Sequence, residues 1–185
     1  MSAHPYQLEG LVLFEPTIFA DDRGAFFESF NASQFNEDTG LSVQFVQDNH
    51  SISHRGVLRG LHYQVSPHAQ GKLVRVTRGA AFDVAVDLRP NSASFGEWAG
   101  VNLSAENRLQ LWIPPGFAHG FLALEDDTHF AYKTTEFWNR TSERAIRWDD
   151  PNIGVRWPLE HRQPIISAKD ADAARFADLR LRSVA

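Results

Sequence analysis

Two segments of the chain carry a histidine among residue types that suit acid–base chemistry. His62 lies in residues 59–64, which read RGLHYQ, and Lys72 follows ten positions after it. His119 ends residues 114–119, which read PPGFAH. Imidazole can accept or donate a proton near neutral pH because its ordinary pKa is roughly 6.5. The two segments therefore predict a site for proton transfer or, since imidazole also binds metals, a metal site.

The spacing around His119 also bears on a metal. Pro114, Gly116 and His119 match the second half of the cupin signature, a motif of jelly-roll barrels. In metal-binding cupins the partner motif supplies His-x-His and a glutamate a few residues later, but here Gln64 replaces the second histidine and no glutamate lies between Gln64 and Lys72. A divalent metal needs imidazole and carboxylate ligands, and a lysine ammonium would repel it. We therefore expect no metal, and acid–base chemistry by the side chains alone.

Composition limits the class of protein. The chain has 185 residues, which favours a single domain over residues 1–185. It contains no cysteine, which excludes disulfides, thiolate metal sites and a cysteine nucleophile. The net charge of −5 argues against a nucleic-acid partner, whereas arginines could still hold an anionic small molecule. Neither a signal peptide nor a membrane span is visible, so we expect a cytoplasmic protein without a membrane partner.

Short alternating runs, separated by turn residues, predict the elements that must position these side chains. Strands are expected over residues 73–78, 81–88, 108–113 and 128–137. Helical patterns cover residues 32–39, closed by Gly40, and residues 170–181, where Ser167 is placed to cap the first turn. We therefore predict an all-β fold: a cupin-type jelly-roll barrel with its core over about residues 41–140 and a few short peripheral helices.

The strands near the two histidines carry an unusual number of polar residues. Gln47, Asn49 and Ser51 share one strand face that has no apolar member, which suits a pocket wall or an exposed edge. Burying an unpaired polar group costs on the order of a few kcal/mol, so a small barrel normally fills its inward faces with aliphatic residues. The pattern therefore favours a polar pocket inside the barrel.

Motifs in order over about residues 11–170 resemble the dTDP-4-dehydrorhamnose 3,5-epimerase family. They are RG at 23–24, FE at 27–28, QDN at 47–49, RGLH at 59–62, Lys72, PGFAHGF at 115–121, YK at 132–133 and DDP at 149–151. The resemblance implies an enzyme that inverts both carbons beside the C4 ketone of dTDP-4-dehydro-6-deoxyglucose. It also implies a homodimer, often with exchanged strands, and no cofactor.

The chemistry of that family explains the residue types. Each inversion removes a proton next to the carbonyl and returns one on the opposite face, which requires a base, an acid and a cation at the enolate oxygen. By resemblance, His62 is the base and Asp170 orients its ring. Tyr132 is the proton donor on the far face, and Lys72 stabilises the oxyanion.

The substrate contacts are assigned in the same way. The resemblance places Arg23 and Arg59 at the pyrophosphate, since a guanidinium matches phosphate oxygens. Phe26 or Trp138 would stack on the base. The remaining substrate-binding candidates are polar or charged: Glu28, Gln47, Asp48, Asn49, His119, Glu143 and Lys169.

Each assignment also has a structural interpretation. Asp170 could simply cap the last helix, and Tyr132 could be ordinary packing on an alternating strand. Lys72 follows Gly71 and could be a turn residue in solvent, while Arg23 could belong to a turn with local ion pairs.

Three different functions also fit parts of the pattern. The first is an epimerase that acts at only one carbon, C3 or C5. The second is a metal-dependent cupin oxygenase or isomerase. The third is a non-catalytic sugar-nucleotide binder, which leaves the combination of His62, Lys72 and Tyr132 unexplained.

Overall fold

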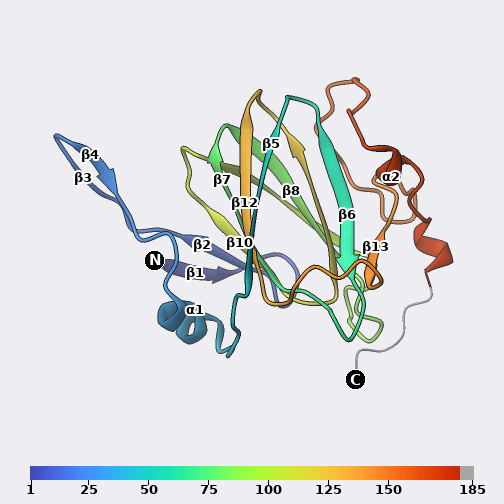
Figure 1. Cartoon of the computed structure of the whole chain (residues 1–185), viewed down its shortest axis with the longest axis horizontal. Helices are drawn as coiled ribbons and strands as arrows, with labels where there is room; N and C mark the ends of the chain where they lie inside the picture. Colours follow the sequence, from blue (N-terminus) through green and yellow to red (C-terminus); the bar gives the residue numbers. More distant parts are fainter. Residues whose placement is uncertain (180–185) are drawn as a thin grey trace.

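Two antiparallel sheets, one of six strands and one of five, form the body of the molecule (Figure 1). We describe residues 1–179 from a computed structural model. Apolar side chains from both sheets, among them Val74, Leu103 and Phe130, fill the space between them. The predicted all-β class and two-sheet jelly-roll barrel are thus confirmed.

The strands of the six-stranded sheet follow one another in the order β1 (Ser2–Pro5), β2 (Val12–Glu15), β10 (Gln110–Ile113), β7 (Lys72–Arg78), β12 (Thr128–Thr134) and β5 (Gln47–Ser53). Those of the five-stranded sheet follow in the order β13 (Glu143–Ala145), β6 (Leu58–Gln64), β11 (Phe117–Ala123), β8 (Ala80–Asp87) and β9 (Trp98–Ser104). The barrel predicted over about residues 41–140 is therefore extended at both ends, by β1 and β2 and by β13.

A separate hairpin of β3 (Phe19–Asp21) and β4 (Gly24–Phe26) projects away from both sheets (Figure 1). Every residue of these two strands is exposed, including the cross-strand pair Phe19 and Phe26. A two-stranded hairpin is marginally stable by itself in water. The exposed phenylalanines therefore leave an apolar surface on the hairpin that no other described part of the chain covers.

Helix α1 (Ala32–Thr39) has the bounds expected from the sequence. Asn31 caps its first turn, and Gly40 closes it with φ at 68°, a left-handed conformation that glycine adopts without strain. Phe35 packs against Phe14 and Trp112 on the outer side of the six-stranded sheet. No helix within residues 1–179 has the length and apolar character needed to cross a membrane.

The prediction of one continuous helix over residues 170–181 is wrong for residues 170–179, the part that the structure describes. The structure has a short helix α2 (Ala168–Ala171), a bridge at Ala174, and a single 3₁₀ turn η1 (Phe176–Asp178). Side chain and backbone partners elsewhere compete with helical hydrogen bonds: Asp150 accepts from the Phe176 amide, and Ala174 accepts from the Arg147 amide. Residues 180 and 181 of the predicted helix lie outside the described residues.

Three predicted strands are confirmed within two residues, and the fourth ends early. The strand expected over residues 128–137 stops at Thr134, because its partners Gln47 and Lys72 are the first residues of β5 and β7. The strand expected from residue 108 starts at Gln110, since Arg108 has a φ of 56° and is not extended.

Strands β6 and β11 approach each other closely beside Arg59 and His62, which both lie on the same face of β6. A Cβ atom on Gly60 would lie 2.5 Å from the Cα atom of Gly120, so the backbones can come this near only with glycine. The pairing register shifts here, because His119 pairs with His62 but Phe121 pairs with Arg59. Residues three apart normally point to opposite faces of a strand, and this irregularity brings Arg59 and His62 to the same side.

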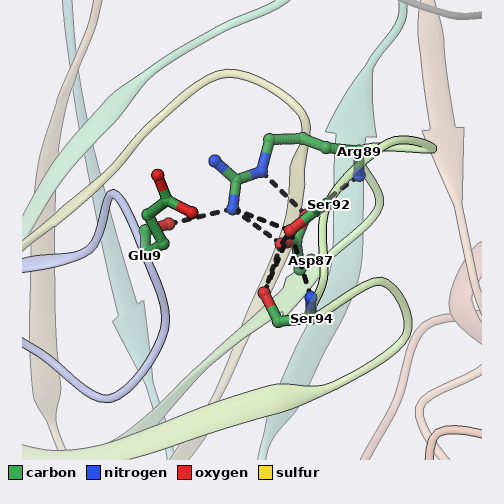
Figure 2. Close-up of polar contacts among 5 residues, drawn as sticks. All are labelled: Glu9, Asp87, Arg89, Ser92 and Ser94. Carbon is green, nitrogen blue, oxygen red and sulfur yellow. Dashed lines mark hydrogen bonds and ion pairs between the residues drawn. The ribbon is translucent and has the colours of Figure 1, made fainter.

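At the end of β8, a buried carboxylate joins three segments of the chain (Figure 2). Asp87 accepts hydrogen bonds from the Arg89 guanidinium at 2.7 and 2.9 Å and from the hydroxyls of Ser92 and Ser94 at 2.6 and 2.8 Å. Arg89 also donates to the carbonyl oxygen of Glu9. The turn after β8 therefore anchors the N-terminal segment to the barrel.

Candidate active site

A cavity of about 540 Å³ lies between the two sheets. Strands β5, β7 and β12 of one sheet and β6 and β11 of the other supply most of its walls, and β13 and the segment around α2 complete them. The predicted site residues that line it are Gln47, Asn49, Arg59, His62, Lys72, His119, Tyr132, Trp138, Glu143, Lys169 and Asp170.

His62 is held by a carboxylate from the other end of the chain. Its Nε2 lies 2.6 Å from Oδ1 of Asp170, whose side chain is only 4% exposed. Burial alone would raise the pKa of Asp170, but the hydrogen bond and charge of His62, together with hydrogen bonds from Ser167 and the Gly60 backbone, outweigh burial and lower the pKa. Because a carboxylate can only accept, Nε2 carries the proton and Nδ1 keeps a free electron pair. The arrangement suits His62 to act as a base.

Tyr132 reaches the same cavity from the opposite sheet. It lies on β12, with Phe130 two residues earlier on the same inward face. Burial raises the pKa of Tyr132 above its ordinary value of 10, so the phenol keeps its proton near neutral pH. The cavity thus has an imidazole from one sheet and a protonated phenol from the other.

Lys72, the first residue of β7, is almost completely buried beside His62. Its Nζ donates to the carbonyl oxygen of His62 at 3.3 Å. Burial lowers the pKa of Lys72 to about 8, and the negative charges of Asp83 and Glu143 oppose this decrease. An ammonium with few other partners in a largely buried setting can stabilise a developing oxyanion strongly. The solvent-exposed turn considered for Lys72 is not what the structure shows.

His119 has a carboxylate partner of its own. Its Nε2 lies 2.7 Å from Oδ1 of Asp83, and both side chains are buried. Burial lowers the pKa of His119, an effect that the charge of Asp83 opposes and that of Lys72 reinforces. His119 is also the direct cross-strand partner of His62.

Charged and aromatic side chains lie at the exposed edge of the cavity. Lys169 and Glu143 form an ion pair of 2.6 Å that joins the segment of α2 to β13. The Trp138 ring is half exposed, and its backbone amide donates to the side chain of Gln47. Arg59 donates to the hydroxyl of Ser53, and its guanidinium is exposed. Cationic groups and an aromatic face are what a nucleoside diphosphate requires.

Asp48 does not line this cavity. It lies on the other face of β5 from Gln47 and Asn49, where it pairs with Lys133 at 3.0 Å. The alternation of side chains along a strand is the reason, since a residue between two inward-facing neighbours must face outward. The structure therefore places Asp48 outside this cavity, and its contact with substrate stays a prediction.

Arg23, Phe26 and Glu28 also lie away from the cavity of their own chain. Arg23 and Phe26 are exposed on the projecting hairpin, where Arg23 pairs with Asp21. Glu28 accepts a hydrogen bond from Asn31 near the start of α1. Strand β1 pairs with β2, and β2 pairs with β10 of the same chain, whereas among the described residues the hairpin strands pair only with each other.

Several lining residues were not among the predicted contacts. Gln64 holds the wall in place: its amide donates to the carbonyl oxygen of His68, and it accepts from the amide of Asn139. Ser51 has a buried hydroxyl without a hydrogen-bond partner among the described residues. Its signal was present in the polar face that it shares with Gln47 and Asn49. The other lining residues that were not predicted as substrate contacts are Val57, Leu58, Tyr63, Gln70, Phe121, Ile165, Ile166 and Ser167.

The side chains of the described residues show no grouping suited to a metal. Within residues 1–179, no three His, Asp or Glu side chains come together as a set of ligands. Gln64, at the position where metal-binding cupins have a second histidine, uses its amide for the loop contacts described above.

The chain is similar over nearly its whole length to known proteins. Residues 5–178 match a family described as dTDP-4-dehydrorhamnose 3,5-epimerase. A dTDP-4-dehydrorhamnose 3,5-epimerase of Pseudomonas aeruginosa is 56% identical over 178 residues, which cover 96% of this chain and 97% of that protein.

Two solved structures bear on the cavity. An epimerase from Legionella pneumophila in complex with dTDP-4-keto-L-rhamnose has a TM-score of 0.92 and 48% identity, and the match covers 96% of this chain and 94% of that one. A 3′-monoepimerase from Streptomyces bikiniensis in complex with dTDP-quinovose has a TM-score of 0.89 and 35% identity, with coverage of 94% and 87%.

Proposed function

Because the chain belongs to the dTDP-4-dehydrorhamnose 3,5-epimerase family, we propose that its cavity binds dTDP-4-dehydro-6-deoxy-D-glucose and inverts C3 and C5. The chain is an isomerase, a carbohydrate epimerase that acts on a sugar nucleotide. Its product, dTDP-4-dehydro-L-rhamnose, belongs to dTDP-L-rhamnose or related deoxysugar biosynthesis. The assignment of roles to individual residues is our own.

One observation carries the mechanism: His62 and Tyr132 face a single cavity from opposite sheets. Inversion requires that a proton leave one face of a carbon and another arrive on the opposite face. A base and an acid on the same wall could only exchange the proton with retention. The opposed positions of the imidazole and the phenol therefore favour epimerisation over other uses of the cavity.

Each inversion then proceeds through an enolate. Nδ1 of His62 takes the proton from the carbon beside the ketone, and the electron pair of the C–H bond moves to the C4 oxygen. Lys72 stabilises that oxygen, and Asp170 stabilises the imidazolium. Tyr132 donates its phenolic proton to the opposite face of the carbon. Exchange with water returns a proton to Tyr132 and removes one from His62, so the reaction consumes nothing.

The exposed edge of the cavity suits the nucleotide. Arg59 and Lys169 supply positive charge for the diphosphate, and Trp138 supplies a ring on which the base can stack. Gln47, Asn49 and Glu143 offer hydrogen bonds to the nucleoside or the sugar.

We further propose that the protein is a homodimer in which the hairpin of β3 and β4 reaches the cavity of the partner. Arg23 and Phe26 are exposed on a hairpin that extends away from its own chain (Figure 1). An exposed Phe19–Phe26 pair and an unpaired sheet edge favour contact with a second copy. Sedimentation analysis tests the dimer, and a monomer at micromolar concentration would contradict it.

Epimerisation at both carbons is tested by proton exchange. Incubation of the substrate with the enzyme in D₂O should place deuterium at C3 and at C5. The competing hypothesis is that the enzyme acts at only one carbon. The similarity to a 3′-monoepimerase supports testing it. Deuterium at only one of the two carbons would establish that hypothesis.

A metal enzyme and a simple binding protein would each give a different result in the same preparation. A metal-dependent cupin oxygenase or isomerase would contain stoichiometric iron, manganese or zinc when purified without chelator. A non-catalytic binder would hold the sugar nucleotide without any exchange of the protons beside the ketone.

We also propose, from the sequence, that the protein is a single domain and is cytoplasmic. Limited proteolysis tests the first proposal, and cell fractionation tests the second.

A further inference from the structure

The cavity contains a second histidine–carboxylate pair, which the proposed mechanism does not use. His119 on β11 is directly opposite His62 on β6, and Asp83 on β8 holds its Nε2 at 2.7 Å. The side chain of Asp83 is 0% exposed and that of His119 is 7% exposed. No assignment made above gives Asp83 a role in the reaction.

A carboxylate at position 83 is unfavourable for the stability of the fold. Its second oxygen, Oδ2, is buried and has no hydrogen-bond partner among the described residues. Ala81 and Ala85, two positions away on the same face of β8, pack in the apolar core instead. Leaving a buried polar group unpaired costs about 1–3 kcal/mol, and more for a charged group. The carboxylate therefore lowers stability at this position. Its function must lie in the contact that it makes with His119.

The contact determines which nitrogen of His119 carries a proton. A carboxylate accepts hydrogen bonds, so Nε2 must donate to Asp83. Burial lowers the pKa of His119, which keeps the ring neutral near pH 7. A neutral ring with its proton on Nε2 has a bare electron pair on Nδ1. His119 lines the cavity, and Nδ1 has no hydrogen-bond partner within residues 1–179.

We propose that Asp83 is a positioning residue for the reaction: it holds His119 in the Nε2–H tautomer, so that Nδ1 accepts a hydrogen bond from a ring hydroxyl of the sugar. This inference rests on the proposed function. A 4-keto-6-deoxy sugar linked through C1 to a diphosphate keeps hydroxyls only at C2 and C3. An acceptor beside His62 would orient that part of the ring against the base.

The test is Asp83→Asn, which keeps the size of the side chain. A carboxamide can donate as well as accept, so His119 would no longer be held in one tautomer; in the serine-protease triad the same exchange acts through the wrong tautomer. We expect the ¹⁵N NMR signals of His119 to show that part of the population carries its proton on Nδ1 in the variant. We also expect kcat/KM to fall by about 10- to 100-fold, the effect typical of removing a carboxylate that orients a metal-bound histidine. Binding of dTDP alone, which lacks the sugar, should not change.

Asp87→Asn provides the matched control. Asp87 lies on the same strand and the same inward face, is equally buried, and also accepts several hydrogen bonds, but from Arg89, Ser92 and Ser94 (Figure 2). At a temperature where it is folded, this variant should keep the wild-type kcat/KM and the wild-type ¹⁵N signals of His119. A loss of kcat/KM equal to that of Asp83→Asn would show that any buried carboxylate on β8 has this effect, and would overturn the proposal.

Two further outcomes would overturn the proposal about Asp83. Wild-type protein whose His119 has a proton on Nδ1 at pH 7 overturns the inference, even if Asp83→Asn does not fold. A folded Asp83→Asn variant with wild-type kcat/KM overturns it as well. Failure of the proposed function is a separate result, because it would appear as absence of turnover by the wild-type enzyme while the tautomer of His119 could still be read.

Discussion

His62 and Asp170 are 108 positions apart in the chain, yet Nε2 of the imidazole lies 2.6 Å from Oδ1 of the carboxylate. The short helix α2 delivers Asp170 to β6, and the hydroxyl of Ser167 caps that helix by accepting from the Asp170 amide. Ser167 is thus the cap of this helix, and Asp170 contributes its amide to the cap while its side chain contacts the histidine. The proposed base therefore depends for its orientation on a segment near the other end of the chain.

Removal of the base should stop proton exchange. We expect His62→Asn to lower the rate of deuterium incorporation by about 10²- to 10⁴-fold, because a positioned base typically contributes this much. Calorimetry should show that dTDP binding is largely intact. The control is His54→Asn, since His54 is exposed and outside the cavity. Unchanged turnover in His62→Asn would remove His62 as the base.

Loss of the phenolic proton should have a milder effect. Tyr132→Phe keeps the ring that packs beside Phe130 but has no acidic hydrogen, so protonation must come from water. We expect a lower rate and an altered ratio of inversion at C3 and C5, measured by NMR of the products. Full and equal inversion at both carbons, at the wild-type rate, would argue against an acid role for Tyr132.

Activity should decline on the alkaline side as Lys72 loses its proton. Burial lowers the pKa of Lys72 to about 8, and only the ammonium form stabilises the enolate oxygen, so kcat/KM should fall as the pH rises through about 8. Tyr132 cannot cause this fall, because burial raises its pKa above 10. Lys72→Arg retains the charge and should move the decline to higher pH, whatever its maximal rate. A wild-type profile that stays level up to about pH 10 would contradict this role.

Asp87 should stabilise the fold in a pH-dependent way. Burial alone would raise the pKa of Asp87, but hydrogen bonds from Arg89, Ser92 and Ser94 lower it to about 2. A lowered carboxyl pKa contributes stability above the ordinary value near 3.8, and this is lost as the pH falls towards 2. Asp87→Asn should therefore lower the free energy of unfolding at pH 7 by about 2 kcal/mol.

Urea unfolding at several pH values measures this effect. The difference between wild type and Asp87→Asn should narrow as the pH falls below about 4, since the wild-type carboxylate then takes up its proton. Asp126→Asn is the control, because the side chain of Asp126 is 78% exposed. A difference that is constant from pH 7 to pH 3 would mean that the charge of Asp87 is not what stabilises the turn.

A mixing experiment tests whether the hairpin serves the partner subunit. Arg23→Ala and His62→Asn should each be nearly inactive alone. Co-expression should restore about a quarter of the wild-type activity, because half of randomly assorted dimers are mixed and each mixed dimer has one complete site. If the hairpin served its own cavity, co-expression would give no more than the sum of the two variants.

Much of the barrel could be predicted from the sequence because strand patterns are local. The alternation around Val74 and Phe130, the helix that Gly40 ends, and the polar face of Gln47, Asn49 and Ser51 all appear where they were expected. The same alternation predicts that Asp48, which lies between the inward-facing Gln47 and Asn49, faces outward, and the structure has it there. Tertiary partners decided what local patterns could not: the amide of Phe176 donates to Asp150 and the carbonyl of Ala174 accepts from Arg147, so the predicted last helix does not form over its described part.

By itself the sequence determined which side chains were available and which of them share a face within a regular strand, because both depend only on residue type and on the period of two. The period of two puts Asp83, Ala85 and Asp87 on one face, but it does not predict that one carboxylate meets His119 and the other meets Arg89. Those contacts depend on the register between β8 and β11 and on the turn that follows β8. Register and turn are set by packing across the whole barrel, and for that reason only the tertiary structure decided which acids belong to the site.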